Sequence, residues 1–159
     1  MLVREAEGRF REGMQHLARG RAREALPFIA AAVDLQTQTD ATAHCQATYL
    51  SYQGLCLCLT RSGVRSGVQL CRRASEMDSC NPDIWRNLGN VALMVGRRGE
   101  AYRAFQAGLR VQPGHPGIVY DLRRMGIRSR PVLPSLGRSN PINVLLGRLG
   151  RLCGSHASA

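Results

Sequence analysis

The sequence contains no lysine, so all 22 of its strongly basic residues are arginines. This absence excludes a Walker-type phosphate lysine, a Schiff-base lysine and any lysine-activated nucleophile. The chain also lacks an apolar run near the roughly 18 residues that a membrane span needs, and no transmembrane segment is expected. Near the N-terminus, Glu5 and Glu7 interrupt the stretch in which a secretory signal needs its apolar core. We therefore expect a cytoplasmic protein.

Motifs for catalysis and metal binding are missing as well. The acidic residues are dispersed, the four histidines are scattered, and no C-x-x-C, H-E-x-x-H or G-x-S-x-G pattern occurs. The sequence thus predicts no catalytic residue, no cofactor, no metal site and no enzymatic activity. In the absence of a secretory signal, the six cysteines are interpreted as buried thiols that act as small hydrophobic residues.

Aromatic residues are few, at 5%, whereas hydrophobic residues make up 44% of the chain. This composition allows a folded core in which small aliphatic side chains fill much of the space. The net charge of +11 is unevenly distributed along the sequence. No acidic residue follows Asp121, whereas seven arginines do: Arg123, Arg124, Arg128, Arg130, Arg138, Arg148 and Arg151. The chain therefore has a nearly balanced body and a basic C-terminal quarter.

Comparison of the chain with itself reveals a repeat of 34 residues. The segment "EAYRAFQAGL" (100–109) lies 34 residues after "SGVQLCRRAS" (66–75), and "EALPFIAAAV" (24–33) is an earlier copy. Each copy places a large residue between two small ones: Ala25, Ile29 and Ala32; Gly67, Cys71 and Ala74; Ala101, Phe105 and Gly108. Each copy also follows a helical pattern that contains a glycine, at Gly13, Gly54 and Gly89. The repeat therefore predicts pairs of helices in which small residues allow a close approach.

The third pair has the clearest pattern. Helical spacing puts Trp85, Leu88, Gly89 and Ala92 on one stripe, and we expect this stripe to face the Ala101, Phe105 and Gly108 stripe of the next helix. Asn81 is a candidate cap, with a proline after it at the first turn. Pro113 is expected to end the second helix.

Residues 81–113 resemble the tetratricopeptide repeat, a helix–turn–helix unit of 34 residues. The residues that match its signature are Trp85, Leu88, Gly89, Gly96, Ala101, Phe105 and Pro113. The resemblance implies an all-α fold, an α-solenoid of about three helix–turn–helix repeats with a capping helix and a basic C-terminal tail. Its repeat domain would span 4–127, with units at about 6–37, 48–80 and 82–115 and a cap at 116–127. A Pro/Arg-rich linker and an amphipathic C-terminal helix would occupy 128–159.

The resemblance also implies a function, because proteins of this family typically hold a partner peptide or helix in a concave groove lined by the first helix of each repeat. The groove would be lined here by Phe10, Met14, Leu17, Ser51, Leu55, Cys58, Arg86, Asn90 and Leu93. We therefore expect a protein–protein interaction or scaffold module with a protein or peptide partner. Matching places in some family members hold a basic residue and an asparagine that grip a terminal carboxylate. The hypothesis is that Arg86, with Asn90 four residues on, anchors an acidic group of the partner.

The tail supplies an alternative. The pattern of residues 139–153 predicts a helix with one apolar stripe, formed by Ile142, Leu145, Leu146, Leu149 and Leu152. This helix could cover an exposed end of the solenoid, dock onto a partner or lie on an anionic membrane. The alternative function is an adaptor whose basic tail binds nucleic acid or acidic membrane. Nucleic acid is disfavoured because no aromatic residue follows Tyr120 to stack on bases. The partner's identity and the oligomeric state stay open.

Overall fold

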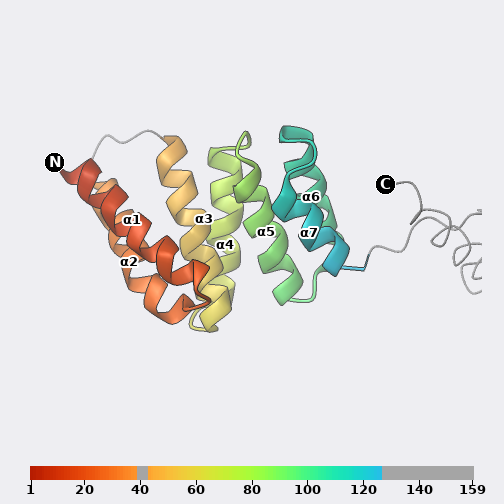
Figure 1. The fold of residues 1–159 in the computed structure, drawn as a ribbon, viewed down its shortest axis with the longest axis horizontal. Helices are drawn as coiled ribbons and strands as arrows, with labels where there is room; N and C mark the ends of the chain where they lie inside the picture. The colour runs from red at the N-terminus through yellow and green to blue at the C-terminus, as the bar shows by residue number, and fades with distance from the viewer. Residues whose placement is uncertain (39–42, 127–159) are drawn as a thin grey trace, which may run out of the picture. The chain divides into compact units, whose positions relative to one another are not determined.

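The computed structural model describes residues 1–38 and 43–126, with the side chains of residues 43 and 44 left out. These residues form seven helices and no strand (Figure 1). The helices are α1 (Leu2–Ala18), α2 (Ala22–Thr37), α3 (Ala43–Thr60), α4 (Val64–Met77), α5 (Pro82–Met94), α6 (Arg98–Val111) and α7 (Pro116–Arg124). The predicted all-α solenoid is thereby confirmed. The basic tail and the helix predicted at 139–153 lie outside the described residues.

The chain divides into two compact units, Met1–Leu122 and Arg123–Ala159, and the second is described only as far as Gly126. In the first unit, α1 packs against α2, α3 against α4 and α5 against α6. Neighbouring pairs meet because α3 contacts α2 and α5, and α4 contacts α5. The turn inside each pair lies along one edge of the stack, at the bottom of Figure 1, and the connection between α4 and α5 lies along the opposite edge.

A glycine on the first helix of each pair accommodates the large residue of the repeated triplet. A methyl group added to Gly13 would come within 2.5 Å of Ile29, one on Gly54 within 2.7 Å of the Cys71 Sγ atom, and one on Gly89 would overlap the Phe105 ring. All nine triplet residues are buried. The close approach that the repeat predicted is therefore present in all three pairs, because glycine leaves room for the partner helix.

The aromatic part of the prediction holds less well at Trp85. Ile84, which the sequence pattern did not single out, is fully buried, whereas Trp85 is only partly buried. The Trp85 Nε1–H donates a 2.9 Å hydrogen bond to the Ser79 carbonyl, so the indole lies along the start of α5. Leu88 is also partly buried, against a cluster that includes Leu55. The two large fully buried residues of α5, Ile84 and Val91, therefore belong to clusters shared with α3 and α4.

Local signals end the helices as expected. The Asn81 side chain caps α5 by accepting a 3.0 Å hydrogen bond from the Asp83 N–H, with Pro82 at the first turn. At the end of α6, Gln112 is extended (φ −132°, ψ 97°) because Pro113 follows it. Gly96 ends α5 with φ +77°, a backbone conformation that glycine adopts freely.

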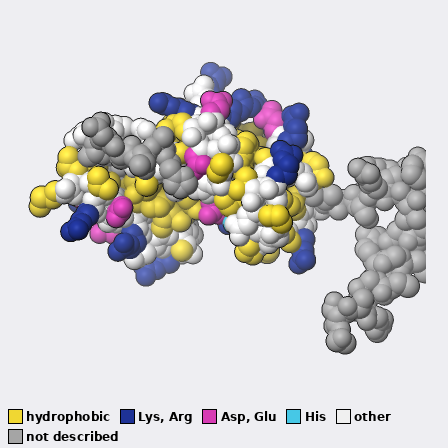
Figure 2. All heavy atoms as spheres, turned by 90° about the horizontal axis from the view of Figure 1, so that it is seen from above, with side chains coloured by type: hydrophobic (Ala, Val, Ile, Leu, Met, Phe, Trp, Pro, Cys, Tyr) yellow, Lys and Arg dark blue, Asp and Glu magenta, His cyan; other side chains and the backbone are white. Residues whose placement is uncertain are grey.

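Hydrophobic side chains run across the middle of the described part when it is viewed from above, and arginines lie at its margins (Figure 2). The buried side chains form clusters between the stacked helices, and the first includes Ala6, Ala32, Tyr49, Leu50 and Ile84. This cluster joins all three helix pairs. Stability therefore depends on contacts between neighbouring pairs, as in other repeat solenoids.

Candidate partner-binding face

The candidate site is the face formed by α1, α3, α5 and α7, called here the first-helix face. Side-chain contacts join each pair of neighbouring helices on it, and their chemistry differs from one junction to the next. Phe10 contacts Tyr52 between α1 and α3, Ser51 contacts Asn87 between α3 and α5, and Arg86 contacts Asp121 between α5 and α7. Three residues predicted to line the groove, Phe10, Ser51 and Arg86, thus hold the helices to one another.

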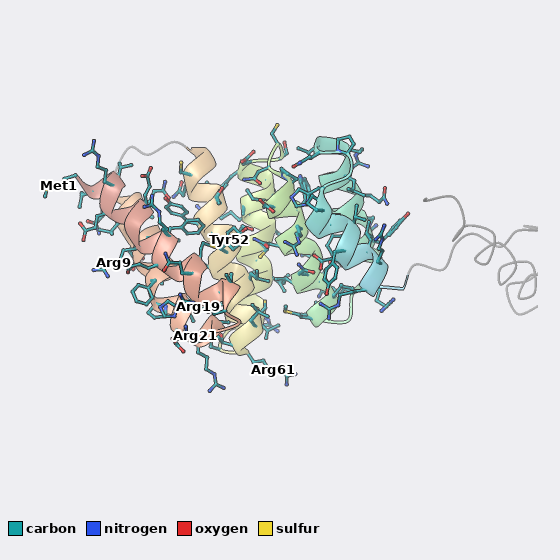
Figure 3. The ribbon with its side chains drawn as sticks, viewed as in Figure 1. Met1, Arg9, Arg19, Arg21, Tyr52 and Arg61 are labelled. Carbon is teal, nitrogen blue, oxygen red and sulfur yellow. The ribbon has the colours of Figure 1, made fainter. Side chains whose placement is uncertain are left out.

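The junction between α1 and α3 is aromatic. The Phe10 ring stacks on Tyr49 with centroids 4.3 Å apart and meets Tyr52 edge-on at 5.6 Å. Figure 3 shows Tyr52 in the middle of the stack. Burial raises the pKa of Tyr52, and the Asp83 carboxylate adds to this effect, while Arg86 and a hydrogen bond with Asn87 oppose it. The Tyr52 hydroxyl therefore stays neutral, and a neutral phenol can both donate and accept a hydrogen bond.

The junction between α3 and α5 is polar and buried. The Asn87 amide donates a 3.1 Å hydrogen bond to the Ser51 hydroxyl, and the two residues are 4% and 0% exposed. The Cys71 thiol donates to the Ser51 carbonyl at 3.4 Å. Ser51 was predicted to line the groove, but a buried side chain with these contacts has no surface left for a partner.

Leu55 and Cys58 are buried too. They form a cluster with Cys71 and Val91, and Leu17 and Leu88 pack against it. The Cys58 thiol donates to the Val64 carbonyl at 3.6 Å, and burial raises the pKa of Cys58. The middle part of the predicted lining therefore belongs to the interior, whereas Met14, Leu17 and Leu93 remain partly exposed.

At the junction between α5 and α7, Arg86 and Asn90, which were predicted to bind a partner's carboxylate, both contact a carboxylate of the chain itself. The Nε–H of Arg86 donates to the Asp121 Oδ2 atom at 2.7 Å, and the Asn90 amide donates to the same oxygen at 3.2 Å. Asp121 is 7% exposed, whereas 35% of the Arg86 side chain is exposed. No acceptor among the described residues is hydrogen-bonded to the Nη atoms of Arg86. Asp121 was not among the residues predicted to line the groove, although it is the last acidic residue of the chain.

Two further contacts on α7 support this arrangement. A methyl group on Gly117 would lie 2.5 Å from the Arg86 Cζ atom, so the guanidinium rests against the first turn of α7. His115 precedes that turn, where its Nδ1 atom accepts a 3.3 Å hydrogen bond from the Ile118 N–H and its Nε2 atom lies 3.4 Å from the Asp83 carboxylate. The start of α7 is therefore held to α5 by polar contacts.

Two exposed aliphatic residues lie at the ends of α3 and α5, beside the turns that follow these helices. Leu59 near the end of α3 and Met94 at the end of α5 are 43% and 46% exposed. Neither residue was predicted as a site residue. Both occupy the same place in their repeats, two positions before the left-handed residue of the turn, Arg61 and Gly96 respectively.

A separate hollow of about 460 Å³ lies on the first helix pair. Its lining combines an apolar part from α2 with charged side chains: Glu5, Arg9, Pro27, Phe28, Ala31, Asp34, Leu35 and Gln38. No residue of the predicted groove lines it. The hollow is therefore distinct from the junction contacts of the first-helix face.

Within residues 1–38 and 43–126, none of the helices combines the length and apolarity needed to cross a membrane. The same ranges hold no group of three or more His, Cys, Asp or Glu side chains that could bind a metal ion.

No protein-family model and no curated protein matches the chain, but solved structures do. The tetratricopeptide-repeat domain of Arabidopsis OM64 is similar with a TM-score of 0.62 and 18% identity, over 79% of this chain and 98% of that one. The first such domain of Spaghetti (RPAP3), bound to the HSP90 peptide SRMEEVD, is similar with a TM-score of 0.60 and 12% identity, over 78% and 92%. YrrB, a tetratricopeptide-repeat protein with an unusual peptide-binding site, is similar with a TM-score of 0.58 and 17% identity, over 75% of this chain and 57% of that one.

These similarities, together with the helix pairs and their glycines, define the class of protein. The chain has the tetratricopeptide-repeat fold, and the resemblance seen in its sequence is confirmed at the level of the fold.

Proposed function

We propose that the protein is an interaction module that binds a peptide or helix of a partner protein on its first-helix face. Support comes from the fold, and from the peptide that the similar domain of Spaghetti (RPAP3) holds. Accessible apolar side chains on α1 and α5 (Met14, Leu17 and Leu93) would contact the partner's apolar residues. Ser51, Leu55 and Cys58 have no part in this proposal because they are buried.

The observation that carries the proposal is the convergence of Arg86 and Asn90 on one carboxylate oxygen. A guanidinium and an amide four residues apart on one helix are spaced to bind a carboxylate, and Asp121 already makes use of this spacing. The Nη groups of Arg86 remain available, and charged hydrogen bonds of this kind are among the strong ones in proteins. We propose that these groups bind an acidic group of the partner, with Asp121 as an internal competitor for the same guanidinium.

Competition predicts opposite effects for two substitutions, which provides the test. Peptides with free C-termini would be selected from a displayed library on the full chain, and the affinities of the selected peptides would be measured by calorimetry. Arg86→Gln should weaken binding by roughly tenfold to a hundredfold, equivalent to losing a charged hydrogen bond of about 1.5–3 kcal/mol. Asp121→Asn should strengthen binding because it removes the competing charge.

The control is Arg103→Gln on the outer helix α6, which removes the same charge from an exposed arginine. Circular dichroism would verify that every variant keeps its helices. If Asp121→Asn and Arg86→Gln weakened binding equally, Arg86 would serve only to hold α7 in place. Selection of no acidic peptide would also contradict the anchoring role of Arg86.

A further inference from the structure

A second surface, separate from the first-helix face, lies along the edge where the turns inside the three helix pairs are aligned (Figure 1). We call residues 19–24, 61–65 and 96–100 the turn edge. It carries seven arginines and two acidic residues, an excess of five positive charges. These are Arg19, Arg21, Arg23, Arg61, Arg65, Arg97 and Arg98, with Glu24 and Glu100. Figure 3 shows Arg19, Arg21 and Arg61 together at this edge.

The opposite edge has the reverse charge. It is formed by residues 1–7, 34–38, 76–83 and 111–115, where the helices begin or end on the other side of the stack (Figure 1). These ranges hold six acidic residues and one arginine: Glu5, Glu7, Asp34, Glu76, Asp78 and Asp83, with Arg4. The two edges therefore differ strongly in charge, and a difference of this kind orients a protein toward an anionic surface.

The two acidic residues of the turn edge leave most of its arginines without a partner. Glu24 pairs with Arg21 at 3.1 Å, and Glu100 pairs with Arg97 at 3.6 Å and with Arg72 of α4 at 2.9 Å. The remaining unpaired arginines are exposed and form no ion pair with another described residue: Arg19, Arg23, Arg61 and Arg65. Their charges are therefore available to an external anion.

The backbone of the middle turn gives an independent reason to assign a role to Arg61. Gly20 and Gly96 end α1 and α5 with φ of +74° and +77°, and Arg61 ends α3 in the same left-handed region with φ +57°. Among the described residues, Arg61 is the only non-glycine residue with a positive φ. A side chain with a Cβ atom is disfavoured in this region, so stability alone favours glycine here as in the other two turns. Strain of this kind persists only where the surrounding structure maintains it, and it is concentrated at functional sites.

The side chains beside the arginines indicate what kind of anionic surface fits. Leu59 and Met94, both nearly half exposed, stand next to the second and third turns. No aromatic residue lies in the three ranges of the turn edge, so the edge offers no platform for stacking nucleic-acid bases. Arginines at the level of lipid phosphates, with aliphatic side chains entering the acyl boundary, match the surface of an anionic bilayer.

We propose that the turn edge docks the protein onto anionic membranes, through the arginines and through Leu59 and Met94. The first-helix face lies on other residues, so a partner and a membrane can be bound at the same time. The proposal concerns the folded repeats and does not depend on the basic tail, which all variants below retain.

The test measures binding of the full chain to vesicles of phosphatidylcholine with phosphatidylserine, by co-sedimentation at several salt concentrations. Arg61→Gly should raise the melting temperature by about 2–4 °C, because glycine relieves the left-handed strain. It should also weaken vesicle binding about fivefold, the loss expected for one arginine near an anionic surface. The combination of Arg19→Gln, Arg61→Gly and Arg65→Gln should weaken binding roughly a hundredfold.

The matched control changes three exposed arginines outside the turn edge, Arg73→Gln, Arg103→Gln and Arg110→Gln. It removes the same charge and should alter vesicle binding by less than about threefold, because charges away from the bilayer are screened by salt. Equal losses in both triple variants would overturn the proposal, since binding would then follow net charge or the tail. An unchanged melting temperature in Arg61→Gly would show that the left-handed conformation of Arg61 is not strained, and it would contradict the role assigned to Arg61 on that ground.

A second pair of substitutions separates a membrane from a nucleic acid. Leu59→Gln with Met94→Gln keeps the charge and should weaken vesicle binding several-fold. Binding to single-stranded DNA should be unaffected by this pair and weaker than binding to vesicles in the unmodified chain. The reverse result would be tight DNA binding that is lost in the turn-edge triple variant, together with vesicle binding that does not change when Leu59 and Met94 are replaced. That result would assign the edge to nucleic acid and overturn the membrane proposal.

Discussion

The side chains of Arg86 and Asp121, 35 residues apart in sequence, form a 2.7 Å ion pair that joins α5 to α7. The Asp121 side chain is 8% exposed, and the Arg86 side chain is 35% exposed. The pair therefore contributes more than an exposed salt bridge, although water still screens part of it. This contact holds the last described helix of the stack, and it places a carboxylate of the chain where a partner's acidic group is proposed to bind.

Asp121→Ala should lower the free energy of unfolding by about 1–3 kcal/mol, because it leaves the Arg86 and Asn90 donors without their internal acceptor. Urea denaturation would measure the loss, and a double-mutant cycle with Arg86→Ala would give the coupling energy between the two side chains. A coupling energy near zero would show that the contact adds nothing to the docking of α7.

Gly89→Ala should destabilise the protein by about 1–3 kcal/mol, because the added methyl group would overlap the Phe105 ring and force the two helices apart. The matched control is Gly8→Ala, inside α1, where an added methyl group meets no atom within 4 Å. That substitution should stabilise the protein by up to about 1 kcal/mol through helix propensity. Thermal and urea unfolding would compare the two, and a loss of stability in both would show that close packing is not the reason for Gly89.

Ile84→Ala should be more damaging than Trp85→Ala, although tryptophan is the larger residue. Ile84 is fully buried among three helix pairs, and such truncations lower stability by about 2–5 kcal/mol. Trp85 is partly exposed and loses mainly its packing beside Gly108 and its hydrogen bond to Ser79. Urea unfolding followed by circular dichroism would rank the two variants. An equal or larger loss for Trp85→Ala would place the indole in the core.

Alkaline pH should destabilise the fold through its buried thiols. Burial raises the pKa of Cys56 from 9.0 to about 11, and burial also raises the pKa values of Cys58 and Cys71. The unfolded thiols ionise from about pH 9 while the folded ones stay neutral, so this contribution to stability is complete below pH 9 and is lost as the pH rises toward 11 for Cys56. The expected slope is up to about 1.4 kcal/mol per pH unit and thiol.

Urea unfolding in the presence of a reductant, at several pH values between 8 and about 11, would measure this slope. Cys56→Ala should reduce the slope by the share of one thiol, whereas Cys80→Ala should leave it unchanged because Cys80 is exposed. A stability that is independent of pH above 9 would mean that these thiols are open to water in the folded protein.

The repeat, the start of α5 and the end of α6 could be predicted from the sequence because they rest on local signals. The starts of the first two units could not, since these were expected at about 6 and 48 whereas α1 begins at Leu2 and α3 at Ala43. The local signals act over a few residues or one repeat length. They are a small residue on each side of a large one, a glycine one helix earlier, and Asn81-Pro82 or Pro113 at helix ends. Backbone sterics and helix periodicity fix what such patterns can form. For this reason the helix pairs and the buried triplets match the structure, including the close approach of Gly89 to Phe105.

Which residues of the first helices stay accessible was decided only by the tertiary structure. Ser51, Leu55 and Cys58 occupy the same repeat positions as Arg86, Asn90 and Leu93, yet the former are buried and the latter are partly exposed. The difference arises from the neighbouring helix. The residues of α3 are covered by α5, whereas those of α5 are covered only in part by the shorter α7. The partner of Arg86 was likewise invisible in the sequence, because an ion pair across 35 residues depends on how two helices stack and on the absence of a side chain at Gly117. Periodicity determines which residues lie on one face of a helix, whereas burial depends on what packs against that face.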